Sequence, residues 1–178
     1  FTVLSPESLV EGDSSGSTAS SRTNSTTSGR ASKKRNNRSC VLRVSSTAGS
    51  VLLTGDIERI VEQALVQKYA SDRTDTDIYP RSELASDILM VPHHGSKTSS
   101  SSSFIESVEP EVALLSAGYK NRYRLPSKKV LARYSGRDIL LFNTASSGAV
   151  TATLREAKPL DINSHREQVK KYWHHVLP

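Results

Sequence analysis

Short apolar runs alternate with segments of helical period between residues 39 and 154, and this alternation limits the chain to few architectures. Two β-rich runs, Cys40–Val44 and Val51–Thr54, flank a turn region with Gly49 and predict a hairpin. From Ile57 to Tyr69 apolar residues recur at helical spacing, which predicts an amphipathic helix of about three turns. Strands that alternate with helices indicate an α/β layered fold.

The same alternation continues downstream. Asp87–Val91 and Val112–Ser116 are continuous apolar runs, which are typical of strands buried on both faces. Two further short helices are expected at 104–108 and 128–134, and two further strands at 139–142 and 149–154. We expect these last two strands to form a hairpin, like the one expected at the start of the pattern, and we therefore predict a mixed sheet rather than a purely parallel one.

A Ser/Thr-rich segment precedes this pattern. Twelve of the nineteen residues from Ser14 to Ser32 are Ser or Thr, and no aliphatic residue there is larger than Ala. Such a segment cannot bury enough apolar surface to offset the cost of ordering its backbone, about 1–2 kcal/mol per residue. We therefore expect Glu11–Asn37 to be a disordered loop or linker, either without function or in transient contact with DNA or lipid. Order is expected to begin at Ser39.

The formal net charge of +6 comes from that segment. Ser14–Arg38 carries six basic residues and no acid, while the rest of the chain holds 18 basic and 18 acidic residues. The global charge therefore describes a tail and not the folded part. The expected division is 1–38 mostly disordered, 39–155 folded, and 156–178 an amphipathic tail.

Several classes of protein are excluded by composition. The single cysteine, Cys40, excludes an internal disulfide and a zinc cluster built on cysteines. No apolar run approaches the roughly 20 residues needed to span a bilayer. The start at Phe1 rather than Met suggests a piece of a longer protein.

Two polar motifs follow buried strands. Asp56 comes directly after Val51–Thr54 in Thr-Gly-Asp, and His93 and His94 come directly after Asp87–Val91. Ligands bind at the carboxyl ends of strands in open α/β sheets, and carboxylate and imidazole groups are ligands for Zn²⁺ or Mn²⁺. Each motif alone also has a plain interpretation, since Asp56 could cap the following helix and the histidines could be polar loop residues.

A basic cluster interleaved with tyrosines lies further along the chain. Seven Lys or Arg residues occur within eighteen positions that contain no acid: Lys120, Arg122, Arg124, Lys128, Lys129, Arg133 and Arg137. Tyr119 and Tyr123 lie among them, so phosphate neutralisation could combine with base stacking. A solvated basic face is equally consistent with the pattern.

Together these motifs resemble the metallo-β-lactamase-like domain of ComEC proteins, membrane channels that internalise DNA during competence. The similar segments are Asn37–Val44, Thr54–Glu58, Ala85–Ser99, Tyr119–Tyr123 and Arg166–His175. The resemblance covers about Ser39–His175. It implies that 39–155 is the C-terminal half of a metallo-β-lactamase αββα-type fold.

The resemblance also implies site residues. Asp56 matches the carboxylate that bridges two divalent ions, zinc or manganese. One of His93 and His94 matches an imidazole ligand, and the other faces the phosphate-binding side, so all three residues are implied as catalytic. The implied contacts to a DNA phosphodiester are Ser96, Lys97, Thr98, Asn121, Arg122 and Arg124. In such sites two ions lower the pKa of a bridging water and neutralise charge on the displaced oxygens.

The sequence departs from the family pattern in two places. The first metal motif, a His-x-His-x-Asp-His run, is absent, so we expect an incomplete metal site in this chain. Leu125 also stands where the family has the histidine of Gly-His-Pro. Either Arg124 takes over a phosphate contact there, or catalysis is weakened.

The function implied by the resemblance is a metal-dependent phosphodiesterase part of a DNA-uptake channel, which degrades the strand that is not imported. Its partners would be DNA and the membrane-channel part of the same polypeptide, at the inner membrane and on its outer, periplasmic face. Two alternatives stay open. One is a non-catalytic DNA-guiding module with a decayed metal site, which Leu125 favours, and the other is a stand-alone metallo-hydrolase that acts on another phosphoester.

Overall fold

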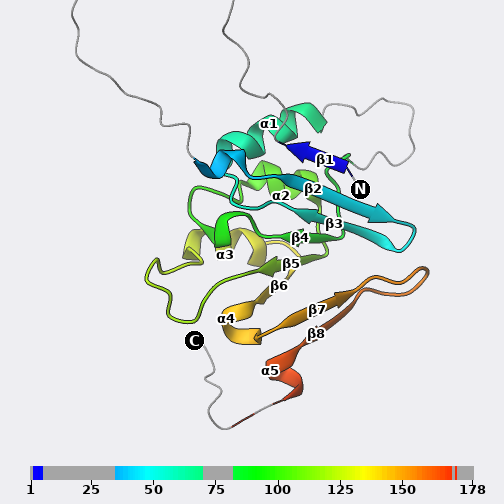
Figure 1. Ribbon diagram of the computed structural model, residues 1–178, viewed down its shortest axis with the longest axis vertical. Coiled ribbons are helices and arrows are strands. Elements are labelled where there is room, and N and C mark those ends of the chain that lie inside the picture. Colours follow the sequence, from blue (N-terminus) through cyan, green and yellow to red (C-terminus); the bar gives the residue numbers. More distant parts are fainter. Residues whose placement is uncertain (1, 6–34, 70–81, 170, 172–178) are drawn as a thin grey trace, which may run out of the picture.

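The computed structural model of the chain describes residues 2–5, 35–69, 82–169 and 171. Its main sheet contains six strands in the order β1-β2-β3-β4-β5-β6 (Figure 1). These strands are β1 (Thr2–Ser5), β2 (Val41–Ser46), β3 (Gly49–Leu53), β4 (Ile88–Met90), β5 (Val112–Leu115) and β6 (Leu140–Asn143). The first three strands pair antiparallel and β3 to β6 pair parallel, which confirms the predicted mixed α/β architecture.

Three helices follow β3, β4 and β5 in the chain and lie against one face of the sheet (Figure 1). They are α1 (Arg59–Tyr69), α2 (Ser102–Val108) and α3 (Lys128–Ser135), all at positions where the sequence predicts helices. Four shorter helical elements are η1 (Arg35–Arg38), η2 (Pro92–Gly95), α4 (Thr144–Ser147) and α5 (His165–Gln168). None of the helices in the described ranges combines the length and hydropathy that a bilayer crossing requires.

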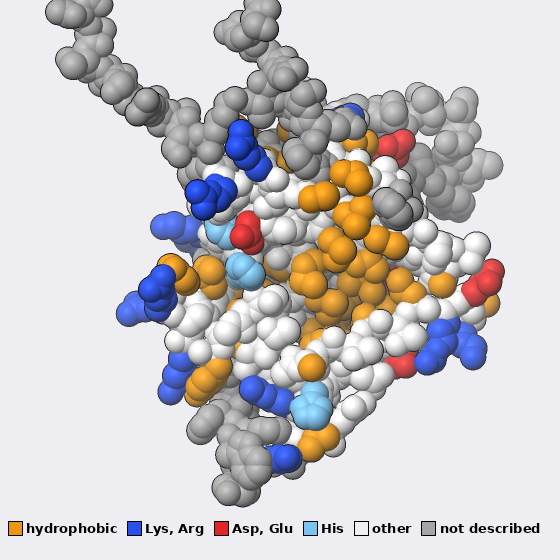
Figure 2. Space-filling view, viewed as in Figure 1, with side chains coloured by type: hydrophobic (Ala, Val, Ile, Leu, Met, Phe, Trp, Pro, Cys, Tyr) orange, Lys and Arg blue, Asp and Glu red, His pale blue; other side chains and the backbone are white. Residues whose placement is uncertain are grey.

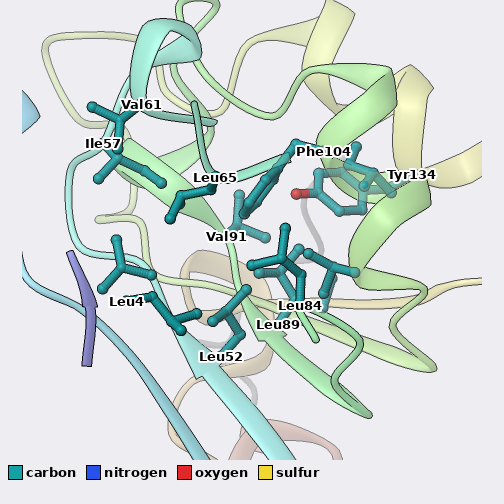
Figure 3. Close-up of a cluster of buried hydrophobic side chains, with 14 of the residues drawn as sticks. Leu4, Leu52, Ile57, Val61, Leu65, Leu84, Leu89, Val91, Phe104 and Tyr134 are labelled. Carbon is teal, nitrogen blue, oxygen red and sulfur yellow. The ribbon is translucent and has the colours of Figure 1, made fainter. Parts of the chain in front are cut away.

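The core lies between the sheet and these helices (Figure 3). Leu52, Leu89 and Leu115 project from successive strands and are 0% exposed. Phe104 of α2 and Tyr134 of α3 are also fully buried against them. Each such aliphatic or aromatic side chain contributes about 1.5–3 kcal/mol on burial, so this layer holds the strand ends in place.

The opposite face of the sheet is apolar and largely open, and we call it the open face. Its side chains alternate with the core-facing ones along each strand. Ile88 and Val112, on the two central strands, are buried on this face. The others are at least partly exposed, and they are Val3, Leu42, Val44, Val51, Leu53, Met90, Leu114, Leu140 and Phe142. Val44 is 42% exposed and Leu140 is 58% exposed. Figure 2 shows the hydrophobic patch on this side of the molecule.

The sequence predicts a hairpin between 139–142 and 149–154, and this prediction is wrong. Strand β6 pairs only with β5 in its sheet, while β7 (Val150–Thr153) pairs with β8 (Asp161–Ser164) in a separate two-stranded sheet. The short helix α4 follows β6 directly, and the Asn143 side chain caps it by accepting the Ala145 N–H at 3.0 Å. This helix redirects the chain before β7 begins.

Two short elements lie ahead of Ser39, where the sequence analysis places the start of order. Strand β1 pairs with β2 at the edge of the main sheet, and η1 immediately precedes β2. The rest of the expected insertion, residues 6–34, lies outside the described residues, as does the end of the tail from residue 172. The division into 1–38, 39–155 and 156–178 stays a prediction.

Candidate functional site

Three loops meet at the carboxyl ends of β3, β4 and β5. They are the β3–α1 loop (54–58), the β4–α2 loop (91–101) and the β5–α3 loop (116–127). The His93 N–H donates to the Gly55 carbonyl at 3.0 Å, and the Ser127 N–H donates to the Gly95 carbonyl at 2.9 Å. Because these strands are parallel, their loops share one edge of the sheet, as the sequence analysis expects for Asp56 and the histidines.

Asp56 and His94 face each other at this edge. Asp56 Oδ1 lies 3.5 Å from His94 Nε2, and both side chains are about half exposed. The other ring nitrogen, Nδ1, lies 2.9 Å from the Ser116 carbonyl, which can only accept a hydrogen bond. In the neutral ring the proton therefore sits on Nδ1, and the Nε2 lone pair points toward the carboxylate.

His93 has different partners. Its Nε2 accepts a hydrogen bond from the Asn36 side-chain amide at 3.1 Å. Its Nδ1 lies 3.7 Å from Glu58 Oε1 and 3.5 Å from the Thr98 hydroxyl, which itself donates to Glu58 Oε1 at 3.3 Å. The two adjacent histidines are thus divided between two carboxylates, with His93 the less exposed of the two.

The backbone explains this division. His93 and His94 both have positive φ, 50° and 53°, and Gly95 continues the turn with φ 74°. Non-glycine residues rarely adopt this left-handed conformation, and it persists where surrounding contacts hold it. A Cβ on Gly95 would lie 2.7 Å from the Pro126 Cβ, so glycine allows the β4–α2 and β5–α3 loops to touch.

Residues 36–39 form part of the site, which sequence reasoning missed. The Asn37 side-chain oxygen accepts the Glu58 N–H at 3.1 Å, and the Ser39 hydroxyl accepts the Asp56 N–H at 3.1 Å. Asn36 binds the His93 ring. The available signal was three short polar side chains, those of Asn36, Asn37 and Ser39, directly before an apolar strand, a pattern that favours side-chain bonds to neighbouring backbone.

The β4–α2 loop carries the implied phosphate contacts Ser96, Lys97 and Thr98. The hydroxyls of Ser96 and Thr98 lie 3.1 Å apart, so one can donate to the other. Ser96 and Lys97 line a cleft of about 800 Å³ that Asp56, His93 and His94 also line. The Thr98 hydroxyl is directed to Glu58 instead.

The β5–α3 loop forms the other wall of the cleft. Tyr123, Arg124 and Leu125 line it, so the position that departs from the family pattern lies at the site. The Arg122 guanidinium lies 4.7 Å from the Tyr123 ring centroid and donates to the Tyr123 hydroxyl. Asn121 bonds within its own loop, donating to the Leu125 carbonyl at 2.7 Å and accepting the Leu125 N–H at 3.0 Å.

The basic cluster separates into two groups. Arg133 donates to the Ser99 and Ser100 carbonyls at 2.9 and 2.7 Å, and Arg137 forms an ion pair with Glu106 at 2.5 Å. These two residues have protein partners. The other five basic side chains are exposed, and they are Lys120, Arg122, Arg124, Lys128 and Lys129. Histidine, acidic and basic side chains gather at one side of the open face in Figure 2.

The residues fit part of a metal site. Asp56 and His94 supply an oxygen and a nitrogen donor whose lone pairs converge, and the Ser116 carbonyl orients the ring as outer partners of metal ligands do. Within the described ranges no group of three or more His, Cys, Asp or Glu side chains could hold an ion. Two donors fall short of the three or four protein ligands that zinc sites use.

Comparison with known proteins finds similar sequences that include a competence protein, and no protein-family model matches the chain. It is 39% identical over 142 residues to the uncharacterized protein YcaI of Escherichia coli, and 37% identical over 139 residues to the competence protein ComA of Neisseria gonorrhoeae. These alignments cover 80% and 78% of the chain. The ComE operon protein 3 of Bacillus subtilis is 34% identical over 116 residues, 65% of the chain.

The chain spans less than a fifth of the length of these relatives, 17% of YcaI, 18% of ComA and 13% of the ComE operon protein 3. These alignments confirm the resemblance to ComEC-family proteins that the motifs indicate. The chain is a homologue of the ComEC-family competence proteins and aligns with a small part of each of them.

Proposed function

We propose that this chain belongs to the DNA-processing part of an uptake system and carries half of a metal-dependent phosphodiesterase site. The observation that carries the proposal is the Asp56–His94 pair, with its converging donors 3.5 Å apart at the carboxyl edge of a parallel sheet. The name of the gonococcal relative, a competence protein, supports a role in the uptake of DNA.

Asp56 and His94 would hold a divalent ion, zinc or manganese. When bound, such an ion activates a water molecule and neutralises charge that develops on a phosphate. The chain's own contribution would be to fix the two donors through Ser116 and Ser39, whose oxygens hold the His94 ring and the Asp56 N–H. The remaining ligands would have to come from outside the described residues.

The open face supports the finer fold assignment, the C-terminal half of a metallo-β-lactamase αββα-type fold. One face of the six-stranded sheet is covered by helices, whereas the other exposes Val44, Leu53 and Leu140 to between 37% and 58%. Contiguous apolar surface of this kind marks an interaction site in a folded protein. A second sheet packed on it, as in sheet-on-sheet folds, would bring further groups to the same edge.

DNA is the proposed substrate because the cleft has a basic rim. Lys97, Arg124 and Lys128 line the same cleft as Asp56, where they would neutralise phosphates. The exposed Tyr119 and Tyr123 rings, each with a cation over one face, would stack on unpaired bases. We propose that this unit works beside a membrane channel of the same polypeptide, on the outer face of the inner membrane.

A second candidate is a non-catalytic DNA-guiding module, and one observation favours it. Leu125 lines the cleft at the position where the family has an imidazole, and it can neither bind a metal nor transfer a proton. The basic rim would still attract nucleic acid in that case.

A nuclease assay on the intact protein, with Mn²⁺ or Zn²⁺ and labelled DNA, tests the proposal. We expect Asp56→Asn to lower hydrolysis by at least about 10–100-fold, the loss seen even for outer partners of metal ligands. Asp138→Asn makes the same charge change at an exposed position and should cleave normally. If the unchanged protein binds DNA without cleaving it in either metal, the guiding module is correct and the phosphodiesterase is not.

A further inference from the structure

Glu62 and Arg133 hold the β4–α2 loop from behind the site. Glu62, on α1, is 0% exposed, and its carboxylate accepts the N–H groups of Ser100 and Ser101 at 2.5 and 2.8 Å. Arg133, on α3, donates to the Ser99 and Ser100 carbonyls at 2.9 and 2.7 Å. Side chains from two helices therefore bind the same peptide segment. Glu62 accepts hydrogen bonds from its N–H groups, and Arg133 donates hydrogen bonds to its carbonyls. We call Glu62 and Arg133 the loop clamp.

The clamped segment has an uncommon backbone conformation. Ser100 is fully buried and has a φ of 55°, in the left-handed region that non-glycine residues rarely adopt. The hydroxyl of Tyr134, which is also 0% exposed, donates to the Ser100 hydroxyl at 3.2 Å. Such a conformation persists only where the surroundings over-determine it, and here the loop clamp and Tyr134 do so.

The clamped segment continues directly into the cleft wall. The Ser99 hydroxyl lies within hydrogen-bond distance of the Pro92 carbonyl at 2.9 Å and of the Ser96 carbonyl at 3.0 Å. Pro92 begins the turn that carries both histidines, and Ser96 and Lys97 line the cleft. A shift at 99–101 would therefore move the hydroxyl and ammonium donors that face a ligand.

A charged group in this position is costly if it serves stability alone. Burying the Glu62 carboxylate takes it out of water, a cost that a well-packed apolar residue would not carry. Hydrogen bonds from two consecutive N–H groups to one carboxylate instead fix the position of the backbone. The desolvation cost of this buried charge is consistent with a loop that must be held in one conformation.

We propose that Glu62 and Arg133 are positioning residues for the binding of a phosphate group of single-stranded DNA in the cleft. They hold the β4–α2 loop so that Ser96 and Lys97 face the phosphate. This inference rests on the proposed function, in which the cleft receives DNA. In this role Arg133 binds the loop and does not contact DNA directly.

An effect of charge alone and a positioning role of Glu62 predict opposite changes in DNA binding for Glu62→Gln. The substitution removes a negative charge close to a basic cleft, so electrostatics alone would strengthen binding of an anion. It also places an amide NH₂ against a backbone N–H, and one of the two clamp bonds is lost. Positioning therefore predicts weaker binding.

Arg133→Gln and Arg137→Gln are a matched pair. Both remove one positive charge from α3 or the residues just after it, four positions apart, but Arg137 bonds to Glu106 and to the Arg133 carbonyl rather than to the loop. If only charge matters, the two variants should weaken DNA binding equally. If Arg133 positions the loop, its variant should weaken binding much more.

The experiment uses the full chain, a fluorescein-labelled single-stranded oligothymidylate, and hydrogen–deuterium exchange at the Ser99–Ser101 amides. We expect Glu62→Gln and Arg133→Gln to weaken binding about tenfold, the effect of misplacing one hydrogen bond to a charged phosphate, and to speed exchange at these amides. Arg137→Gln should leave that exchange unchanged. Tyr134→Phe, which removes only the hydroxyl bond to Ser100, is the second variant if Glu62→Gln does not fold, and it should shift both readouts in the same direction.

Unchanged or tighter binding by Glu62→Gln, or equal losses in Arg133→Gln and Arg137→Gln, would overturn the positioning role alone. Absence of binding by the unchanged chain would overturn the proposed DNA function, and the phosphate role of the loop clamp with it. Faster exchange without weaker binding would also overturn the positioning role, because the loop clamp would then hold the loop for stability only.

Discussion

His93 and His94 are neighbours in sequence, yet their rings serve different carboxylates. The His94 ring faces Asp56 Oδ1 at 3.5 Å, whereas the His93 ring faces Glu58 Oε1 at 3.7 Å. Consecutive left-handed residues separate the two rings. The half-exposed pair, Asp56 and His94, is the one open to an incoming ion, while Asn36 already occupies Nε2 of His93.

This separation predicts which histidine binds metal. We expect the chain to bind Zn²⁺ or Mn²⁺ weakly, because the described residues offer only two converging donors where structural and catalytic zinc sites use three or four. In an isothermal titration, His94→Ala should remove this binding and His93→Ala should keep most of it. Nanomolar, stoichiometric binding of two ions by the unchanged chain would show that the partition of ligands proposed above is wrong.

The close contact between the β4–α2 and β5–α3 loops predicts that Gly95→Ala destabilises the chain more than Gly118→Ala does. Gly95 has a φ of 74°, and a Cβ there would lie 2.7 Å from the Pro126 Cβ and 3.1 Å from Leu115 Cδ1. Gly95→Ala should therefore lower the free energy of unfolding by about 1–3 kcal/mol, measured by urea denaturation. Gly118→Ala is the control, because its Cβ would meet only Asn121 Cβ, at 3.8 Å. Equal losses in the two variants would contradict the close approach at Gly95.

The parallel part of the fold could be predicted because its signals are local. Asp87–Val91 and Val112–Ser116 are continuous apolar runs, and each is followed by a segment of helical period. The strand-end rule then placed Asp56 and the histidines at one edge, where the structure has them. These inferences needed no knowledge of which distant segments touch.

Features that depend on distant partners could not be predicted. Strand β7 has the same alternation whether it pairs with β6 or β8, and only the turn through α4 decides between them. Arg133 looks like any other member of the basic cluster in sequence, but the buried carbonyls of Ser99 and Ser100 bind it. Asn36 follows a Ser/Thr-rich stretch that carries no sign of a partner at His93.

Burial of Glu62 predicts a pH dependence of stability. Burial raises the pKa of Glu62 above 4.5, although the Ser100 and Ser101 N–H groups and the charge of Arg133 act against this. The folded state therefore keeps this proton to higher pH than the unfolded state does. Between about pH 4.5 and the raised value, the contribution of Glu62 to the free energy of unfolding must fall as pH rises.

The difference between the unchanged chain and Glu62→Gln isolates this contribution, because Gln does not titrate. Urea denaturation of both chains from about pH 4 to pH 8 should show the unchanged chain losing stability relative to the variant as pH increases. The raised pKa of Tyr134, which faces Glu62 and Arg133, lies above this range, so the Tyr134 hydroxyl does not titrate within it. If the stability of the unchanged chain relative to the variant is constant or rises with pH, the pKa of Glu62 is not raised.

The basic loop and the basic tail should differ in how salt affects their contribution to DNA binding. Arg122 and Arg124 are attached to an ordered loop beside the cleft, so Arg122→Gln and Arg124→Gln should weaken binding of single-stranded DNA. Each lost phosphate contact should also reduce the log–log salt slope by about 0.7. Replacing Lys33 and Lys34 by Gln should slow association at low salt but barely change affinity near 0.15 M salt, where charges more than about 8 Å apart are screened. Fluorescence anisotropy across a salt series measures both sets. If the tail variant loses affinity and the loop variants keep it, the loop is a solvated basic face and the nucleic-acid role proposed for it fails.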